Sequence, residues 1–134
     1  MKSYIADTNF YLRFILQDVK SQAKLSEKYL NKAKLGEIKI FFPDEVVLEM
    51  EFVLRSFYSV NREEITKSLL GLMKIEYVDV ENRSLWIKTL EIYKEKNVSL
   101  LDIFLFLKAK DVGSEVLSFD RDFQKLKKYE KQNI

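Results

Sequence analysis

The chain has 134 residues, of which 47% are hydrophobic and 33% are charged, a composition typical of one folded globular domain. With 23 Lys and Arg against 21 Asp and Glu, its net charge of +2 excludes a polybasic nucleic-acid-binding tail and an acidic tail protein. The chain has no His and no Cys, which excludes disulfides, zinc sites built on His or Cys, a thiolate nucleophile and a His general base.

Short apolar runs alternate with stretches of helical periodicity along the chain. This alternation predicts an α/β fold with a mainly parallel sheet and helices on both faces. Neither a repeat nor a Gly/Ser-rich linker interrupts it, which predicts a single domain over 1–134. In chain order we expect a strand over 3–6, helices over 10–16 and 21–35, a strand over 38–42, helices over 44–58 and 62–73, a strand over 75–80, helices over 83–96 and 99–112, a strand over 116–119 and a helix over 122–129.

Acidic residues directly follow the first and the fourth predicted strands. Asp7 comes after the first strand and Asp120 after the fourth. Because open parallel sheets bind ligands beyond the carboxyl ends of their strands, both residues are expected at the functional edge. A helix is predicted after each of them, so a helix N-cap is the alternative role for either acid alone. Two such acids at one edge favour a site.

Two further acids lie in helical segments that are otherwise rich in apolar residues. Asp102 interrupts a run of Leu, Ile and Phe, where a shielded carboxylate needs a compensating partner. The alternative for Asp102 is local, because Ser99 fits a helix N-cap and the helix dipole stabilises an acid in the first turn. Glu49 has apolar residues at i−3, i+3 and i+4, which predicts a core-facing carboxylate. Glu51 and Arg55 are expected to form an ordinary surface ion pair.

These acids would repel one another if the fold gathered them at one sheet edge, and divalent cations would relieve that repulsion. Carboxylates are hard oxygen ligands that suit Mg²⁺ and Mn²⁺. Such ions generate hydroxide and stabilise a leaving oxygen in phosphodiester cleavage, and no His is needed. The residue types therefore point to metal-assisted phosphodiester hydrolysis.

Four segments together resemble the PIN-domain family, and within it the small ribonucleases that form the toxin half of VapBC-type toxin–antitoxin pairs. The resemblance covers nearly the whole chain and rests on the order and spacing of YIADTN at 4–9, PDEVVLEMEFVL at 43–54, LDIFL at 101–105 and VLSFDRDF at 116–123. It implies a PIN-like three-layer α/β/α sandwich around a mainly parallel sheet of four strands, or of five where a last edge strand is present. The chain ends soon after Leu126, so that fifth strand is expected to be missing or minimal.

The resemblance also implies roles for individual residues. The family's catalytic and metal-binding acids, which use Mg²⁺ or Mn²⁺, fall on Asp7, Glu49, Asp102 and Asp120, with Asp122 as a further metal ligand. The implied supporting residues are Thr8, Asn9 and Ser118. Members of the family cleave RNA, commonly dimerise and are inhibited by an antitoxin. The resemblance therefore implies an RNA substrate, a VapB-like antitoxin and a homodimer.

Basic residues offer candidate contacts for RNA phosphates, and such contacts position a backbone without reading its sequence. One basic face winds along the helix predicted over 21–35. Another basic group begins beside Asp120 and consists of Arg121, Lys125, Lys127, Lys128 and Lys131, of which the first four are the RNA-binding candidates. The alternative for both groups is a solvated surface with no ligand.

No apolar stretch reaches the roughly 18–20 residues that span a bilayer, and no cleavage site follows the N-terminal run. Together with the absence of Cys, this predicts a cytoplasmic protein without membrane contact. The leading hypothesis is a metal-dependent endoribonuclease of the PIN toxin type. The alternative is a catalytically weak PIN-like module that binds RNA or protein, and metal binding distinguishes the two.

Overall fold

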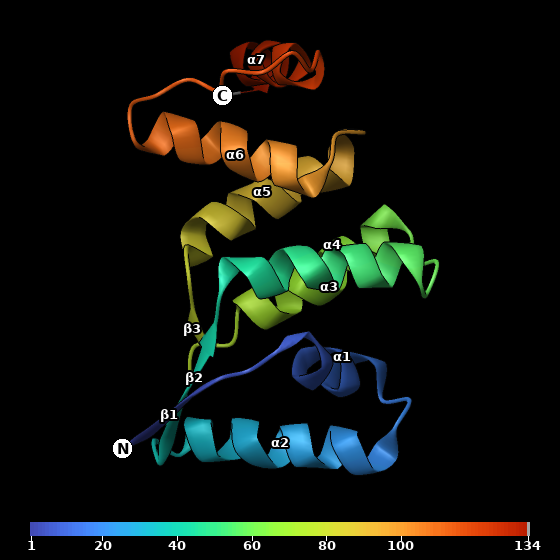
Figure 1. Ribbon diagram of the computed structural model, residues 1–134, viewed down its shortest axis with the longest axis vertical. Helices are drawn as coiled ribbons and strands as arrows, with labels where there is room; N and C mark the ends of the chain where they lie inside the picture. Colours follow the sequence, from blue (N-terminus) through green and yellow to red (C-terminus); the bar gives the residue numbers. More distant parts are fainter. Residues whose placement is uncertain (134) are drawn as a thin grey trace. The chain divides into compact units, whose positions relative to one another are not determined.

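The computed structural model describes residues 1–133, and the chain divides into two compact units, Met1–Arg83 and Ser84–Ile134 (Figure 1). The first unit holds a parallel sheet with its connecting helices, and the second is helical. The predicted α/β class is therefore confirmed. Within residues 1–133 each predicted helix is present, and the helix predicted over 62–73 has those bounds in the structure.

Three parallel strands in the order β1-β2-β3 form the sheet of the first unit. Because the strands run the same way, with Ile5 opposite Phe41, their carboxyl ends lie at one edge of the sheet. Asp7 follows β1 there, Asp44 follows β2 and Glu81 follows β3. The elements are β1 (Lys2–Ile5), α1 (Thr8–Leu16), α2 (Lys20–Lys34), β2 (Ile38–Phe42), α3 (Asp44–Ser56), α4 (Arg62–Met73) and β3 (Asp79–Val80).

Tyr11 fixes the start of α1 against the sheet. Its ring stacks on that of Phe42 with the centroids 4.1 Å apart, and both side chains are fully buried. The Tyr11 hydroxyl donates a hydrogen bond to the Phe41 carbonyl at 3.2 Å. Burial raises the pKa of Tyr11 above its ordinary value, so this hydroxyl stays a donor further into the alkaline range. The packing holds the turn between β1 and α1, where Asp7 lies, close to the middle strand.

The third strand is shorter than predicted, because residues that precede it form a turn. The Val78 N–H donates to the Ile75 carbonyl at 3.3 Å, and only Asp79–Val80 pair with β2. The Arg83 guanidinium closes this turn by donating to the carbonyls of Met73, Ile75 and Val78. A turn that uses its own carbonyls in this way cannot also extend a strand ladder.

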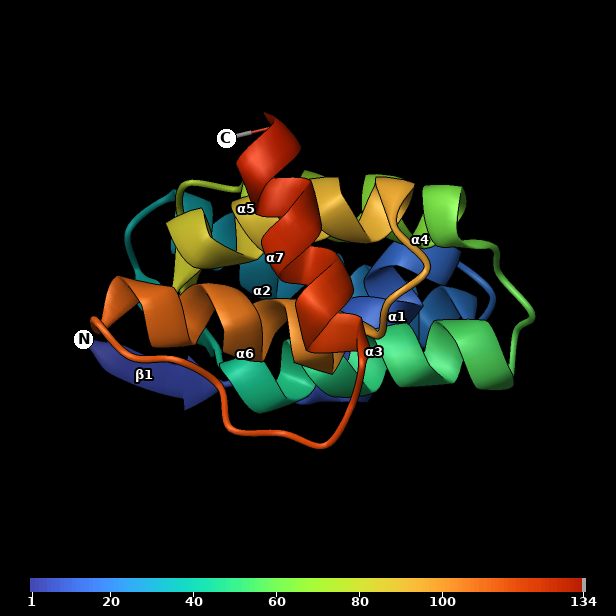
Figure 2. The same cartoon turned by 90° about the horizontal axis from the view of Figure 1, so that it is seen from above.

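The second unit is built on three helices, α5 (Arg83–Glu95), α6 (Leu100–Asp111) and α7 (Asp122–Asn133), of which α5 begins at the last residue of the first unit. The rings of Trp86 on α5 and Phe104 on α6 stack with centroids 3.9 Å apart. Helix α7 crosses α6 and buries Phe123 and Leu126 (Figure 2). This packing holds the first turns of α6 and α7 near each other.

The prediction of a strand over 116–119 is wrong. In the described chain this segment has no regular secondary structure and pairs with no strand, so the sheet has three strands in place of the four or five expected. A strand needs a neighbour for its N–H and C=O groups, and the sequence pattern alone does not supply one. Leu117 is 99% exposed and Phe119 is fully exposed, as expected for an unpaired segment.

Within residues 1–133, every helix is too short or too polar to cross a lipid bilayer.

Candidate active site

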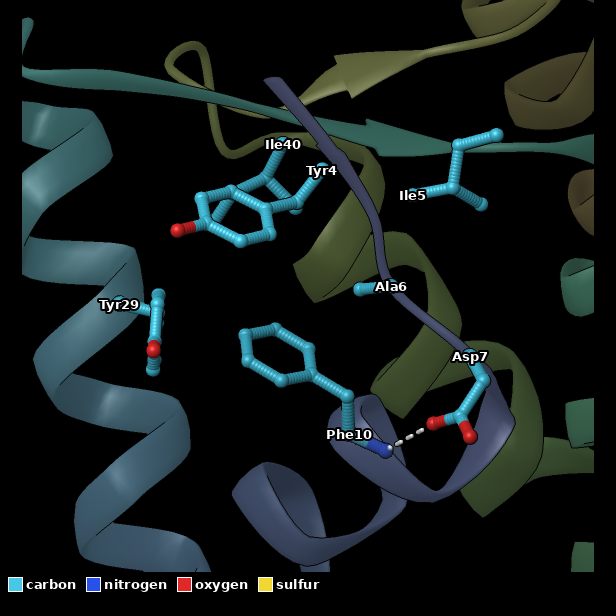
Figure 3. A pocket seen from close by; sticks show the side chains of 7 residues that line it. All are labelled: Tyr4, Ile5, Ala6, Asp7, Phe10, Tyr29 and Ile40. Atoms are coloured by element: carbon cyan, nitrogen blue, oxygen red, sulfur yellow. Dashed lines mark hydrogen bonds between the residues drawn. The ribbon is translucent and has the colours of Figure 1, made fainter. Parts of the chain in front are cut away.

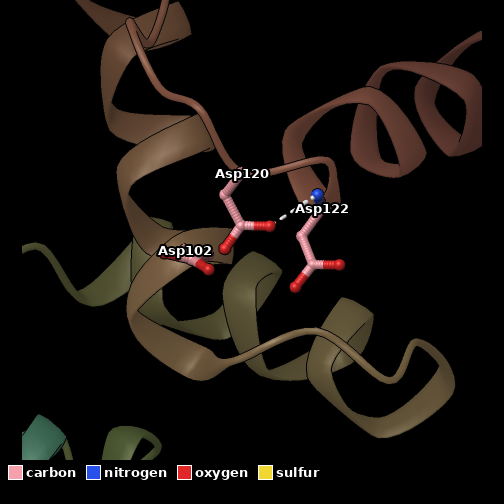
Figure 4. A group of neighbouring side chains, drawn as sticks. All are labelled: Asp102, Asp120 and Asp122. Atoms are coloured by element: carbon pink, nitrogen blue, oxygen red, sulfur yellow. Dashed lines mark hydrogen bonds between the residues drawn. The ribbon is translucent and has the colours of Figure 1, made fainter.

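Three aspartates of the second unit point toward one another (Figure 4). Asp102, Asp120 and Asp122 each offer a carboxylate oxygen, and these oxygens all lie within 4.8 Å of one another. Asp102 and Asp122 are half-buried, whereas Asp120 is exposed. Of the acids predicted from the sequence, these three are brought together.

Side-chain hydrogen bonds to the backbone set the positions of the three aspartates. Ser99 caps α6, and its hydroxyl oxygen accepts a hydrogen bond from the Asp102 N–H at 3.1 Å. Ser118 accepts from the Asp120 N–H at 2.9 Å, and Asp120 Oδ1 accepts from the Asp122 N–H at 2.9 Å. The last two contacts form a tight turn that leads into α7. The local alternative for Asp102 is therefore also realised, since it lies in a capped first turn.

The donor set of this cluster suits a hard divalent cation. It offers carboxylate oxygens, which Mg²⁺ and Mn²⁺ prefer, and it contains no softer ligand. Asp102 and Asp122 lie in the first turns of α6 and α7, where the helix dipoles favour negative charge. Lys125 offsets part of the negative charge, because its Nζ lies 3.2 Å from Asp122 Oδ1. Three carboxylates with one Lys still carry excess negative charge, which a bound cation would balance.

Asp7 and Glu49 belong to the first unit, at or after the carboxyl ends of β1 and β2. Asp7 is exposed, and its Oδ1 accepts a hydrogen bond from the Phe10 N–H at 3.0 Å, which confirms that it caps α1. Figure 3 shows Asp7 at one end of a hollow lined by aromatic side chains. Thr8 is buried and Asn9 exposed in the first turn of α1.

The predicted orientation of the two α3 glutamates is wrong. Glu49 is exposed, whereas Glu51 is only 6% exposed. The buried residues of α3 are Val47, Met50, Glu51 and Leu54, so Glu51 lies on the core-facing stripe and Glu49 outside it. The predicted ion pair of Glu51 exists, with Arg55 Nε donating to Glu51 Oε2 at 2.7 Å, but its acid is buried. Exposure leaves Glu49 accessible to a ligand.

The basic group after Asp120 is partly engaged with acids of the same unit. Lys125 contacts Asp122, and Lys127 Nζ lies 3.9 Å from Glu115 Oε1. Arg121 and Lys128 are exposed. Arg121 separates the aspartates at 120 and 122, which makes it the basic residue of this group nearest to the cluster along the chain.

Glu81 and Asn82 are strand-end residues that the sequence analysis missed. Glu81 Oε1 accepts a hydrogen bond from the Asp44 N–H at 3.0 Å, and the Asn82 side-chain amide donates to Asp44 Oδ2 at 2.9 Å. Both contacts fix the start of α3, the helix that carries Glu49. The rule that selected Asp7, an acid directly after a predicted strand, would also have selected Glu81.

Comparison with known proteins assigns this fold to a family. The family model described as PIN domain matches residues 4–129, so the chain belongs to the PIN domain family, as its sequence motifs implied. A similar protein is the VapC ribonuclease of Aquifex aeolicus (strain VF5), which is 28% identical over 123 residues. The match covers 91% of this chain and 90% of the relative. No solved structure matches the chain.

Proposed function

We propose that this chain is a metal-dependent endoribonuclease, the toxin of a toxin–antitoxin pair, which hydrolyses phosphodiester bonds of RNA. The observation that carries the proposal is the cluster of three carboxylates within 4.8 Å, at positions that the PIN resemblance had marked as acidic. The family match and the VapC ribonuclease relative support the same reaction.

Catalytic acids are assigned to both units. Asp102, Asp120 and Asp122 would hold Mg²⁺ or Mn²⁺ through carboxylate oxygens, and Asp7 and Glu49 are the exposed acids of the first unit assigned to the same reaction. The bound ion would activate water and stabilise the leaving oxygen. The chain's supporting residues are Ser118, which orients the Asp120 backbone, and Thr8 and Asn9, which follow Asp7.

RNA contacts, partners and location belong to the same proposal. Arg121, Lys125, Lys127 and Lys128 would meet phosphates, although the acidic neighbours of Lys125 and Lys127 reduce their net attraction. We propose a single cytoplasmic PIN domain that forms a homodimer and is inhibited by a VapB-like antitoxin, as the resemblance to VapBC-type toxins implies.

Metal dependence tests this proposal. We expect the purified protein to cleave labelled single-stranded RNA with Mn²⁺ or Mg²⁺, to stop when EDTA is added, and to recover when Mn²⁺ is restored. A single-stranded DNA of the same sequence shows whether the reaction is specific for RNA. Undiminished cleavage in EDTA contradicts a metal-dependent reaction. RNA binding without cleavage in either metal favours the non-catalytic binding module.

A further inference from the structure

A hollow of about 340 Å³ opens beside Asp7 in the first unit (Figure 3). Its side walls are the aromatic rings of Tyr4 on β1, Phe10 on α1 and Tyr29 on α2, and Ile40 of β2 also lines it. The Tyr4 and Tyr29 rings meet edge to face, with their centroids 5.4 Å apart. Three different elements therefore present aromatic side chains to one small space.

These three rings are not part of the fully buried hydrophobic core. Tyr4, Phe10 and Tyr29 are only half-buried, whereas their neighbour Tyr11 is fully buried against Phe42. Half-buried aromatic rings around a hollow can offer their π-faces and edges to a flat ligand. A volume of about 340 Å³ is near the small end of the range for ligand sites, which fits one ring system and not a large cofactor.

Two lysines contact the tyrosine rings of the aromatic hollow. Lys2 Nζ lies 5.4 Å from the centroid of the Tyr4 ring, and Lys32 Nζ lies 5.5 Å from that of Tyr29. Helix α2, which supplies Tyr29, has the sequence KSQAKLSEKYLNKAK, in which Lys far outnumbers acidic residues. Aromatic rings that stack bases, combined with cations that meet phosphates, are the features by which proteins bind single-stranded nucleic acid.

We propose that this hollow is a nucleobase subsite, which holds one unpaired base of an RNA strand beside Asp7. The inference rests on the proposed function, because it takes RNA as the ligand. The base would stack among Tyr4, Phe10 and Tyr29, and the adjoining phosphates would meet Lys2 and Lys32. Since every base has a π-face, such a site adds affinity and fixes the position of the strand without selecting one sequence.

A binding measurement on the full chain tests the subsite apart from catalysis. The Asp102→Asn variant serves as the background, because residue 102 belongs to the second unit and the substitution leaves the hollow intact. A fluorescent six-nucleotide RNA is titrated in EDTA with the Asp102→Asn protein. The same titration is made with double variants that combine Asp102→Asn with Tyr29→Leu, Tyr29→Phe or Tyr77→Leu. Tyr77, which is 39% exposed and lies outside the hollow, is the matched control in the same unit.

We expect Tyr29→Leu to weaken RNA binding about 10-fold, because Leu keeps apolar bulk but has no π-face. Tyr29→Phe keeps the ring and should restore binding to within about twofold of the background, as should Tyr77→Leu. An RNA strand with abasic sugars should bind equally to the background and to Tyr29→Leu. The subsite proposal is overturned if Tyr29→Leu lowers the affinity for the normal and the abasic strands equally. It is also overturned if Tyr29→Leu does not lower the affinity for the normal strand.

Photo-crosslinking needs no substitution and so remains decisive if a variant fails to fold. RNA that carries 4-thiouridine should crosslink the wild-type chain at Tyr4, Phe10 or Tyr29, and crosslinks confined to other residues overturn the proposal. The two proposals fail differently. Cleavage by the wild type with no Tyr29 effect removes only the subsite. If RNA binding depends on the Tyr29 ring but the chain never cleaves RNA, only the proposed function is refuted.

Discussion

Asp7 combines a structural role with the proposed catalytic one. Its Oδ1 accepts a hydrogen bond from the Phe10 N–H at 3.0 Å, so it caps α1, and it follows β1 at the edge of the sheet where parallel strands end. The two roles can be separated. Asn and Ser cap helices about as well as Asp does, but neither carries a charge.

We predict that Asp7→Asn keeps the free energy of unfolding within about 0.5 kcal/mol of the wild type but slows RNA cleavage about 100-fold or more, whereas Asp7→Ala also costs about 1 kcal/mol. Urea denaturation and cleavage assays on the same preparations measure both effects. If Asp7→Asn is as destabilised as Asp7→Ala, the charge matters to α1 itself. If Asp7→Asn cleaves RNA at the wild-type rate, Asp7 has no catalytic role.

Glu49 and Glu51 show why periodicity alone could not place the α3 acids. Both have apolar residues three or four positions away, so a buried position was open to either. The structure buries Glu51 because it lies on the stripe of Val47, Met50 and Leu54. The position of the candidate acid along the chain could be predicted from the sequence, whereas the face of the helix depended on how α3 packs.

We predict that Glu51→Ala lowers the free energy of unfolding by about 1–3 kcal/mol, because it removes a buried, charge-assisted hydrogen bond with Arg55. Glu49→Ala, its matched control on the exposed face, should stay within about 0.5 kcal/mol of the wild type. Chemical denaturation measures both values. The reverse order of destabilisation would mean that α3 packs with its other face inward.

At the scale of elements, an ion pair stabilises the end of α1. Arg13 Nη1 donates to Asp18 Oδ2 at 2.5 Å and Nη2 donates to the Tyr58 hydroxyl at 3.1 Å, which links α1 to the chain after α3. The hydrogen bond from Arg13 lowers the pKa of Asp18 below its ordinary value of 3.8. A lowered folded-state pKa adds stability above the ordinary value, and this stability is lost as the pH falls through the folded-state pKa.

We therefore predict that Asp18→Asn unfolds more easily than the wild type at pH 7, and that the difference closes as the pH falls below about 4. Urea midpoints for the two proteins between pH 7 and pH 2.5 measure it. A difference that stays constant over this range would show that the ion pair does not contribute to stability.

Helices could be predicted from this sequence better than strands, and the reason is physical. A helix closes its hydrogen bonds within one segment, so the apolar pattern of 62–73 was sufficient to give the bounds of α4. A strand exists only with a partner. The segments 38–42 and 116–119 look alike in sequence, yet only the first is paired, between β1 and β3. The turn closed by Arg83 likewise could not be inferred from the residues of the third strand.

At the scale of the whole molecule, metal binding should couple to stability. An ion held by the Asp102, Asp120 and Asp122 carboxylates would bind the folded chain, so it would add about 2.7 kcal/mol at 100 times its dissociation constant. We predict that Mn²⁺ raises the melting temperature of the wild type and of Asp111→Asn, but much less that of Asp102→Asn. Asp111, an exposed acid at the other end of α6, is the control. Equal shifts in all three proteins would place the bound ion elsewhere.

Single-turnover cleavage rates of matched variants in saturating Mn²⁺ show whether acids of both units take part in RNA cleavage. We expect Asp7→Asn in the first unit and Asp102→Asn in the second each to slow cleavage about 100-fold or more. Glu37→Gln and Asp111→Asn, exposed acids of the same two units, should cleave at the wild-type rate. Undiminished cleavage by both Asp7→Asn and Asp102→Asn would mean that neither acid takes part in catalysis.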